Sequence, residues 1–217
     1  ISQEQLEQLL QQQEAEREAA QFAEAEKLIR QAVEDSDDPE LEEIAESLKI
    51  QSTPEGLRIE LLDQEKVALF PLGSANMEER LRKLLAKVAE IIKKLPNKIK
   101  ISGHTDSRPF AAGSERTNWD LSADRANASR RALEQLGVAK SRIAQIVGMA
   151  DRDPIEPNDL LAPENRRISI VLLRQRTATG TNEDPIIDKA PTGTENSLPS
   201  VRAQNGNPSS VTSAGPR

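Results

Sequence analysis

The sequence predicts an α/β (α+β) fold, a two-layer sandwich in which helices cover one face of a mixed sheet. The first observation is a set of short apolar or alternating segments, typical of strands, at 56–62, 67–70, 98–102, 143–147 and 168–173. The second is a pair of intervening segments with apolar residues at helical spacing, near 77–95 and 121–136. Strands and helices therefore interleave along the chain, as they do in a sheet covered by helices.

Residues 1–50 are expected to form a helical segment that acts as a linker or in dimerisation. The first 34 residues are rich in Gln, Glu and Ala and contain neither Gly nor Pro, which favours a helix. Their apolar residues form a stripe too irregular for a heptad repeat. The helix therefore either packs loosely with a solvated surface or serves as a dimerising or spacer helix. The run Asp-Ser-Asp-Asp-Pro at 35–39 predicts a stop, and a second short helix is expected near 39–48.

Residues 51–175 are expected to form the folded domain. Leu57, Ile59 and Leu61 alternate with polar residues, which predicts a strand with one buried face. A turn and a partner strand at 67–70 are expected to follow. Apolar residues at helical spacing then predict a long helix, which a Pro-Asn pair ends at 96–97.

The second half of the domain contains two long loops, at 103–120 and 151–163. A loop of such length inside a compact domain is usually functional. The first loop leads into a helix that Ser122 is expected to cap and that ends at Gly137. The second loop leads into the closing strand at 168–173.

The composition restricts the class of function. The formal net charge is −7, which disfavours sequence-independent binding of nucleic acid because such binding needs a basic surface. Cysteine is absent, which excludes disulfides and cysteine metal sites, and no apolar run reaches the length of about 18 residues that a membrane helix needs. The chain starts at Ile1 rather than Met, which suggests a fragment or a processed product, from which an upstream membrane anchor could have been removed. Residues 176–217, rich in Pro, Gly, Ser, Thr and Asn, are expected to be a disordered tail.

Asp106 and Arg125 are the candidate functional pair. Asp106 follows the strand at 98–102, and Arg125 lies on the apolar face of the next helix, near its start. A carboxylate accepts bonds from an ammonium and a guanidinium binds a carboxylate bidentately, so the pair can hold a small zwitterion. Spacing alone leaves two alternatives open. Asp106 can instead accept amide bonds in a turn, and Arg125 can form a structural salt bridge, with Asp106 itself as one partner.

Three short motifs surround this pair, in order along the chain. They are Gly103, Thr105 and Asp106; Asn118, Leu121, Ser122, Arg125 and Ala126; and Asn165, Arg166 and Arg167. On these motifs the chain resembles the OmpA-like family of peptidoglycan-binding domains, over about residues 55–175. The stretch 118–131 and the long loop before it look closer still to the flagellar motor stator members of that family.

This resemblance implies a non-catalytic periplasmic module that anchors a stator to the cell wall. Asp106 would contact the backbone or amine of a diaminopimelate residue in the peptidoglycan stem peptide, and Arg125 would hold its carboxylate, helped by the positive end of its helix. Arg166 would add a second grip on carboxylate. The implied partners are peptidoglycan, a second copy of the chain, and a membrane-embedded stator subunit reached through a transmembrane segment absent from this sequence. No cofactor or metal is implied.

The other motif residues are expected to support the site. Asn118 and Thr105 either brace the loops or contact the ligand. Leu121 and Ser122 support the helix that carries Arg125, and Asn165 braces the loops. Two departures from the family leave the rim of the pocket undefined: the spacing between the Asp and the Arg is longer than usual, and the loop at 71–75 lacks a polar Asn that some members use.

A catalytic interpretation has little support in the sequence. His104 is the only histidine, and a lone histidine cannot build a zinc site without further nitrogen or sulfur ligands. In a strand, Ser102, His104 and Asp106 would stand side by side, which does not place the hydroxyl at the outer imidazole nitrogen. The alternatives that stay open are another OmpA-like wall anchor, such as an outer-membrane protein domain or a peptidoglycan-associated lipoprotein, and a cell-wall hydrolase.

Two further side chains near the loops have expected roles. Trp119 is expected to be a packing anchor, with a ligand or sugar contact as the alternative. Arg167 is expected to face solvent beside Arg166.

Overall fold

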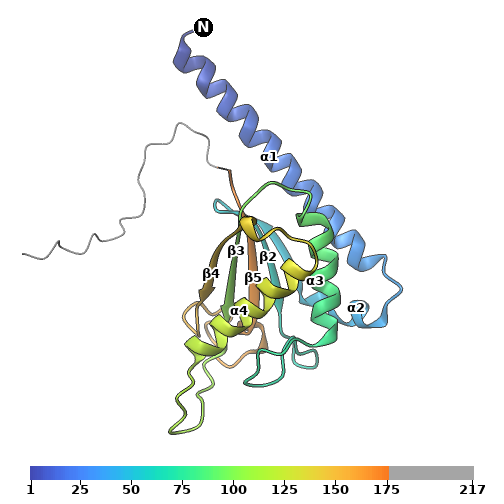
Figure 1. The fold of residues 1–217 in the computed structure, drawn as a ribbon, viewed down its shortest axis with the longest axis vertical. Coiled ribbons are helices and arrows are strands. Elements are labelled where there is room, and N and C mark those ends of the chain that lie inside the picture. The colour runs from blue at the N-terminus through green and yellow to red at the C-terminus, as the bar shows by residue number, and fades with distance from the viewer. Residues whose placement is uncertain (176–217) are drawn as a thin grey trace, which may run out of the picture. The chain divides into compact units, whose positions relative to one another are not determined.

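A mixed sheet of five strands forms the centre of the structure, in the order β1-β2-β5-β3-β4 (Figure 1). The computed structural model describes residues 1–175, so the tail predicted at 176–217 lies outside the described residues. The strands are β1 (Leu48–Ser52), β2 (Gly56–Leu62), β3 (Ile99–His104), β4 (Ile143–Gly148) and β5 (Arg167–Leu173). The β3–β4 pair is parallel and the other three pairs are antiparallel.

Four α-helices accompany this sheet in residues 1–175. They are α1 (Gln3–Glu34), α2 (Pro39–Ile44), α3 (Glu79–Ile92) and α4 (Asn118–Gln135), with short 3-10 turns at Ala45–Ser47, Lys140–Arg142 and Pro163–Asn165. Helices α3 and α4 pack on the same face of the sheet (Figure 1). The two-layer α/β architecture predicted from the sequence is confirmed.

The core lies between that face and α3. Leu57, Ile59 and Leu61 of β2 are fully buried, as their alternation with polar residues predicts. Leu84 and Val88 of α3 are fully buried against the same cluster. A fully buried aliphatic side chain stabilises a fold by roughly 1.5–3 kcal/mol, so this aliphatic core compensates for the near absence of aromatic residues.

The register of the two central strands positions the candidate site. In the β3–β5 pair, His104 lies opposite Arg167. Asp106 lies two residues beyond one member of this pair, and Arg166 lies one residue before the other. Both side chains therefore emerge at the same end of the sheet, although 60 positions separate them in the chain.

Helix α4 approaches β3 closely and begins earlier than expected. A Cβ atom at Gly103 would lie 2.0 Å from the carbonyl oxygen of Ser122, so only glycine allows this contact. The N-cap is Thr117, which forms a reciprocal capping box with Asp120, so the prediction that Ser122 is the cap is wrong. The stronger signal was the Thr-x-x-Asp pattern, in which each side chain bonds the other residue's backbone N–H.

The partner of β2 is β1, not the strand predicted at 67–70, and that prediction is wrong. The carboxylate of Asp63 accepts a 2.7 Å bond from the backbone N–H of Leu69, which fixes this segment as an irregular loop. Leu69 and Phe70 are nevertheless buried, and this explains the apolar run. The expected boundary between residues 50 and 51 falls within β1.

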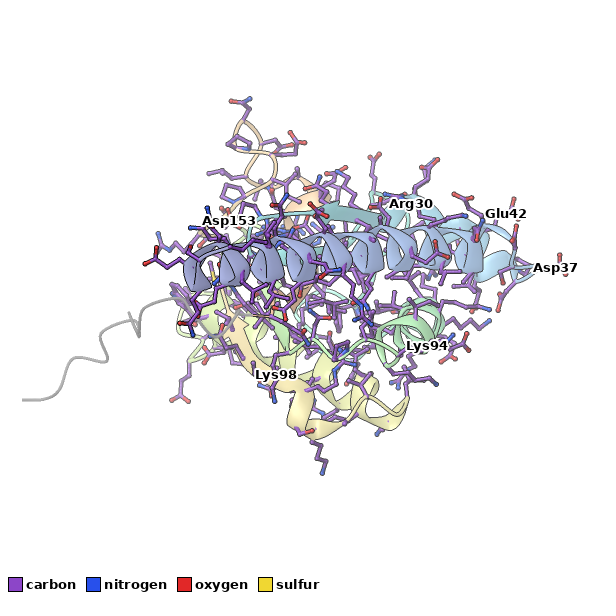
Figure 2. The ribbon with its side chains drawn as sticks, turned by 90° about the horizontal axis from the view of Figure 1, so that it is seen from above. Arg30, Asp37, Glu42, Lys94, Lys98 and Asp153 are labelled. Carbon is purple, nitrogen blue, oxygen red and sulfur yellow. The ribbon has the colours of Figure 1, made fainter. Side chains whose placement is uncertain are left out.

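Helix α1 is buried along its second half only. Phe22, Ala25, Ile29 and Val33 are buried, whereas the large apolar side chains of the first half are exposed. This division explains the irregular stripe. Arg30 projects from the second half of α1 (Figure 2). Its guanidinium also reaches the sheet, where it donates a 3.3 Å bond to the carbonyl of Ile50.

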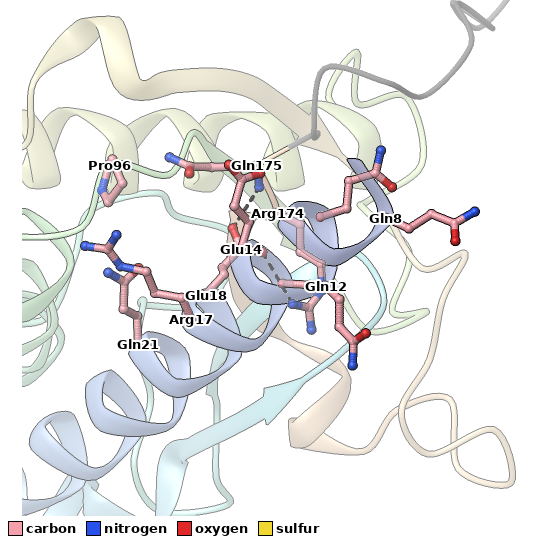
Figure 3. A pocket seen from close by; sticks show the side chains of 11 residues that line it. Gln8, Gln12, Glu14, Arg17, Glu18, Gln21, Pro96, Arg174 and Gln175 are labelled. Carbon is pink, nitrogen blue, oxygen red and sulfur yellow. Dashed lines mark hydrogen bonds and ion pairs between the residues drawn. The ribbon is translucent and has the colours of Figure 1, made fainter. Parts of the chain in front are cut away.

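Glu18 attaches the middle of α1 to one end of the sheet. Its carboxylate accepts 2.8 Å bonds from the Asn97 side chain and the Gln175 backbone, and it pairs with Arg174 at 3.4 Å (Figure 3). The guanidinium of Arg174 also lies 5.5 Å from the ring centroid of Phe22. No helix within residues 1–175 is both long enough and apolar enough to cross a membrane.

The close approach at Gly103 makes a stability prediction. Gly103→Ala is expected to lower the free energy of unfolding by at least about 3 kcal/mol, because α4 must shift to admit the methyl group. Gly113→Ala is the control, since nothing lies within 4 Å of its Cβ position and only its positive φ of 83° is strained, at about 1 kcal/mol. Urea denaturation measures both, and equal losses would contradict the role of close packing at Gly103.

Candidate functional site

A cavity of about 140 Å³ lies at the end of the sheet where β3 ends and β5 begins. Four segments form it: the loop before α3, the loop between β3 and α4, the first half of α4, and the residue just before β5. The lining residues are Leu72, Gly73, Thr105, Asp106, Arg108, Pro109, Phe110, Asn118, Leu121, Arg125 and Arg166. Five of these residues were predicted from the sequence to contact a ligand, and the structure brings all five to one cavity.

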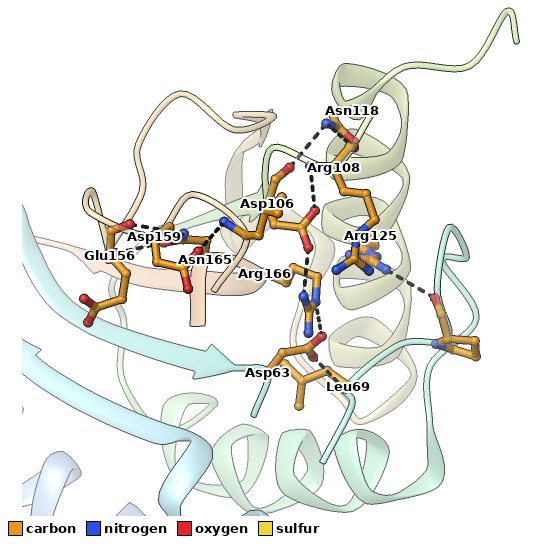
Figure 4. A network of polar contacts seen from close by, with 12 residues as sticks. Asp63, Leu69, Asp106, Arg108, Asn118, Arg125, Glu156, Asp159, Asn165 and Arg166 are labelled. Carbon is orange, nitrogen blue, oxygen red and sulfur yellow. Dashed lines mark hydrogen bonds and ion pairs between the residues drawn. The ribbon is translucent and has the colours of Figure 1, made fainter. Parts of the chain in front are cut away.

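Arg166 links two buried carboxylates at the base of this cavity (Figure 4). Its Nη1 donates to Asp106 Oδ2 at 2.8 Å, and its Nε donates to Asp63 Oδ2 at 2.7 Å. Asp63 also accepts the Leu69 backbone N–H, and Asp106 accepts the Arg108 backbone N–H at 3.1 Å. Arg166 is therefore held rigidly by partners from two other strand ends.

Arg125 is placed differently, because it has no carboxylate partner among residues 1–175. Its Nε donates to the carbonyl of Ser74 at 2.9 Å and its Nη2 to that of Pro71 at 3.3 Å. Its guanidinium lies 4.9 Å from the ring centroid of Phe70. The side chain is only 3% exposed in relative terms, so a cation without a counter-ion is buried beside the cavity. The salt bridge between Asp106 and Arg125, left open by the sequence, is not formed.

Burial and pairing shift the pKa values of this group in a consistent way. Burial lowers the pKa of Arg125 to about 10, and the nearby Asp63 charge only partly opposes it. Burial also lowers the pKa of Arg166, but its bonds to Asp63 and Asp106 outweigh this and raise it overall. For Asp63, burial raises the pKa despite the bond from Arg166. Arg125 is thus the cation that gains most from a new anionic partner.

Thr105 and Asn118 have different environments. Thr105 lines the cavity, and its buried hydroxyl has no hydrogen-bond partner in residues 1–175. A buried polar group without a partner is costly, so a ligand atom would satisfy it. The amide of Asn118 donates to the backbone carbonyls of Asp106 and Arg108 at 3.3 and 3.2 Å, which braces the loop.

The supporting residues connect the loops around the cavity. The side chain of Asn165 accepts from the Glu156 backbone at 2.9 Å and donates to the Asp159 carbonyl at 2.8 Å, as expected for a brace. The hydroxyl of Ser122 accepts the backbone N–H of Ala150 at 3.0 Å and so connects α4 to the loop after β4. Leu121 is buried in the cavity wall.

Two predicted side-chain environments, those of Arg167 and Trp119, differ from the sequence expectation. Arg167 does not face solvent, because it is buried in ion pairs with Glu60 at 3.2 Å and Asp153 at 2.9 Å. Trp119 is 51% exposed and lies under the guanidinium of Arg152 at 5.9 Å, so it is not a buried anchor. His104 is buried on the sheet and its Nδ1 has no partner in the described part of the chain.

Sequence reasoning missed two residues of the site, Asp63 and Arg108. Asp63 stands directly after an alternating strand, which is the same signal that identified Asp106, but it was assigned to a turn. Arg108 lies two residues after Asp106 in the functional loop. Its type and position carried no spacing signal that separates a ligand contact from a solvated charge.

Residues 69–167 match the OmpA family. This stretch is an OmpA family domain. The motility protein B of Escherichia coli (strain K12) is 41% identical over 143 residues, which are 64% of this chain and 46% of that protein. The chain therefore spans about half the length of the curated relatives it matches first.

Solved structures share the fold of this OmpA domain. The periplasmic domain of Helicobacter pylori MotB is 24% identical, with a TM-score of 0.52 over 59% of this chain and 83% of that one. The cell wall anchor of the T6SS from Pseudomonas aeruginosa is 22% identical, with a TM-score of 0.51 over 60% of this chain and 90% of that one. At these identities the likeness is one of fold.

The buried His104 predicts an acid-sensitive fold. Burial lowers its pKa to about 3, with the charge of Arg167 acting in the same direction. The unfolded chain, with a histidine pKa of about 6.5, binds the proton first, so stability is expected to fall as pH drops from about 6.5 towards 3, by at most about 1.4 kcal/mol per pH unit.

Urea unfolding at several pH values, for the wild type and His104→Asn, tests this expectation. The variant should lose less stability over the same interval, because it has no proton to bind there, while all other titrating groups are shared. Parallel curves for the two proteins would show that His104 is not the group responsible.

Proposed function

We propose that this domain is a non-catalytic peptidoglycan-binding anchor of the MotB type, which attaches a flagellar motor stator to the cell wall in the periplasm. One observation carries the proposal: within the described part of the chain, Arg125 is buried without a carboxylate partner beside a cavity that Asp106 also lines. A buried, unpaired guanidinium is costly until an anion arrives. The cavity therefore fits a ligand that supplies a carboxylate.

The ligand we propose is the zwitterionic end of a diaminopimelate residue in a stem peptide. Its carboxylate would accept bonds from the N–H groups of Arg125 that Ser74 and Pro71 leave free. Its ammonium would donate to Asp106, where each oxygen already accepts one bond and keeps a second lone pair. The Thr105 hydroxyl supplies a further polar contact.

Pre-organisation supports this binding mode. Arg166, fixed between Asp63 and Asp106, holds the acceptor carboxylate in place before a ligand arrives. Apolar groups of Leu72, Phe110 and Leu121 line the same cavity and suit the aliphatic chain between the two ends of diaminopimelate. Little ordering would then be needed on binding, which favours affinity.

The machine that this anchor serves is proposed from its relatives. Identity to the motility protein B of Escherichia coli favours a stator, with the membrane partner reached through a transmembrane segment outside this sequence. The fold shared with the cell wall anchor of the T6SS keeps another wall-anchoring role as the second candidate. A hydrolase is disfavoured because His104 bonds neither Ser102 nor Asp106, and a pKa near 3 makes it a poor base.

Binding to purified sacculi tests the proposed site. Arg125→Ala and Asp106→Asn are each expected to weaken co-sedimentation about 30-fold or more, which is the cost of losing one partner of a desolvated charge contact. Arg131→Ala, on the same helix but exposed and remote from the cavity, is the control and should bind like the wild type.

Circular dichroism of every variant shows whether the fold persists. Folded Arg125→Ala and Asp106→Asn proteins that still sediment with sacculi would refute the site. Release of soluble muropeptides by the wild type would instead support a hydrolase.

Pairing of two copies is proposed to occur through the first half of α1. Leu6, Leu9 and Leu10 are each about half exposed there, at the i, i+3 and i+4 spacing that places them on one face. Two linked anchors would bind the wall more tightly than one. Replacing all three with Gln is expected to shift the mass measured by light scattering from dimer to monomer, while Leu160→Gln, an exposed loop control, should not. A monomeric wild type would contradict this pairing.

A further inference from the structure

The side chains that line the cavity carry more positive charge than is required to bind a zwitterion. Arg108, Arg125 and Arg166 line it, against the single carboxylate of Asp106. Even when Asp63, bonded behind Arg166, is included, three guanidinium groups face two carboxylates. This local excess contrasts with the net charge of −7 on the whole chain. Because a zwitterionic ligand end adds no net charge, one of the three guanidinium groups still has no matching negative charge after that end has bound.

Arg108 is the arginine whose positive charge is left without a partner. Arg166 is shared by two carboxylates, and Arg125 is assigned to the carboxylate of the proposed ligand. The guanidinium of Arg108 forms no ion pair and no hydrogen bond within residues 1–175. By contrast, Arg116 on the same loop pairs with Asp124 at 2.7 Å. Arg108 is exposed, so it lies at the mouth of the cavity rather than at its base.

The backbone of Arg108 is held firmly although its side chain is unpaired. Its N–H donates to Asp106 at 3.1 Å and its carbonyl accepts from Asn118 at 3.2 Å. Pro109 follows and restricts the chain further. The side chain therefore starts from a fixed point beside Asp106, and Figure 4 shows it extending from there towards Arg125. The guanidinium of Arg108 can therefore bind a ligand group that lies next to the group inside the cavity.

We infer that Arg108 is a specificity-determining residue that binds a second carboxylate of the ligand, one residue away from the zwitterionic end in the cavity. This inference rests on the proposed function. In a stem peptide, diaminopimelate is joined to the side-chain carboxyl of a glutamate, which leaves the α-carboxylate of that glutamate free. This side-chain link and the aliphatic chain of diaminopimelate place that carboxylate further from the zwitterionic end than the about 3.8 Å between residues joined by an ordinary peptide bond. It would therefore lie outside the cavity, towards the mouth, where the exposed side chain of Arg108 stands. The substrate class is thus a stem peptide whose glutamate is not amidated.

Two muropeptides that differ only at that glutamate provide the test. One is a disaccharide tripeptide with diaminopimelate and a free glutamate α-carboxylate, and the other carries the α-carboxamide. Calorimetric titration of the wild-type chain is expected to show about tenfold weaker binding of the amidated form, because a charge-assisted bond is lost. Arg108→Gln should bind both forms equally, at the level of the amidated form. Arg116→Gln, on the same loop, should discriminate like the wild type.

The outcomes separate this inference from the proposed function. Equal binding of both muropeptides by the wild type, or retained discrimination by Arg108→Gln, overturns the role of Arg108 and leaves the anchor proposal intact. Equal binding combined with competition by inorganic phosphate identifies a general anion site and also overturns it. If the wild type binds neither muropeptide, the proposed function fails, and this inference fails with it.

Discussion

The pairing of Arg166 with Asp63 and Asp106 is the interaction on which the site depends. It joins the end of β2, the end of β3 and the start of β5, and all three side chains are largely buried, with Asp63 and Asp106 near 5% exposed. Removing one member of such a group leaves another charge buried and unpaired, at a cost of about 3–5 kcal/mol. The three strand ends, and the loops that follow them, are therefore fixed relative to one another before any ligand binds.

This pairing also makes the cavity asymmetric. Asp106 already has a cationic partner, whereas Arg125 bonds only to backbone carbonyls. In the proposed mode, an incoming ammonium must share Asp106 with Arg166, while an incoming carboxylate meets a buried guanidinium that has no carboxylate partner within residues 1–175. The carboxylate contact should thus dominate affinity, and the ammonium contact should mainly set orientation. In the proposed binding mode, the charge clamp that the sequence suggested is therefore asymmetric, with a stronger contact at the carboxylate and a weaker one at the ammonium.

Much of the fold was predictable because its signals are local. Alternation in β2 and the apolar stripe of α3 reflect burial against a single core, and both predictions are confirmed. The predicted strand at 67–70 failed because burial alone cannot distinguish a strand from a loop held by one carboxylate, here Asp63 with Leu69. The shift of the α4 cap from Ser122 to Thr117 has a similar cause, since a polar residue inside a helix can bond a neighbouring loop instead.

The site was predictable in its members but not in its pairing. The motifs shared with the family identified residues that do line one cavity. The pairing of Asp106 with Arg166 rather than with Arg125, however, depends on the β3–β5 register. Strand register is a long-range property that spacing in the chain does not encode. For the same reason the sequence did not reveal that Arg167, which was expected to face solvent, is buried in ion pairs with Glu60 and Asp153.

The attachment of α1 has a mechanical consequence. Glu18 grips residues next to the start of β3 and the end of β5, whereas the cavity lies at the opposite ends of the same two strands, roughly 20 Å away for a six-residue strand. Tension between α1 and a bound wall would therefore run lengthwise along β3 and β5. A force in that direction loads all the backbone hydrogen bonds between β3 and β5 at the same time. A force across the strands would instead break these bonds one after another.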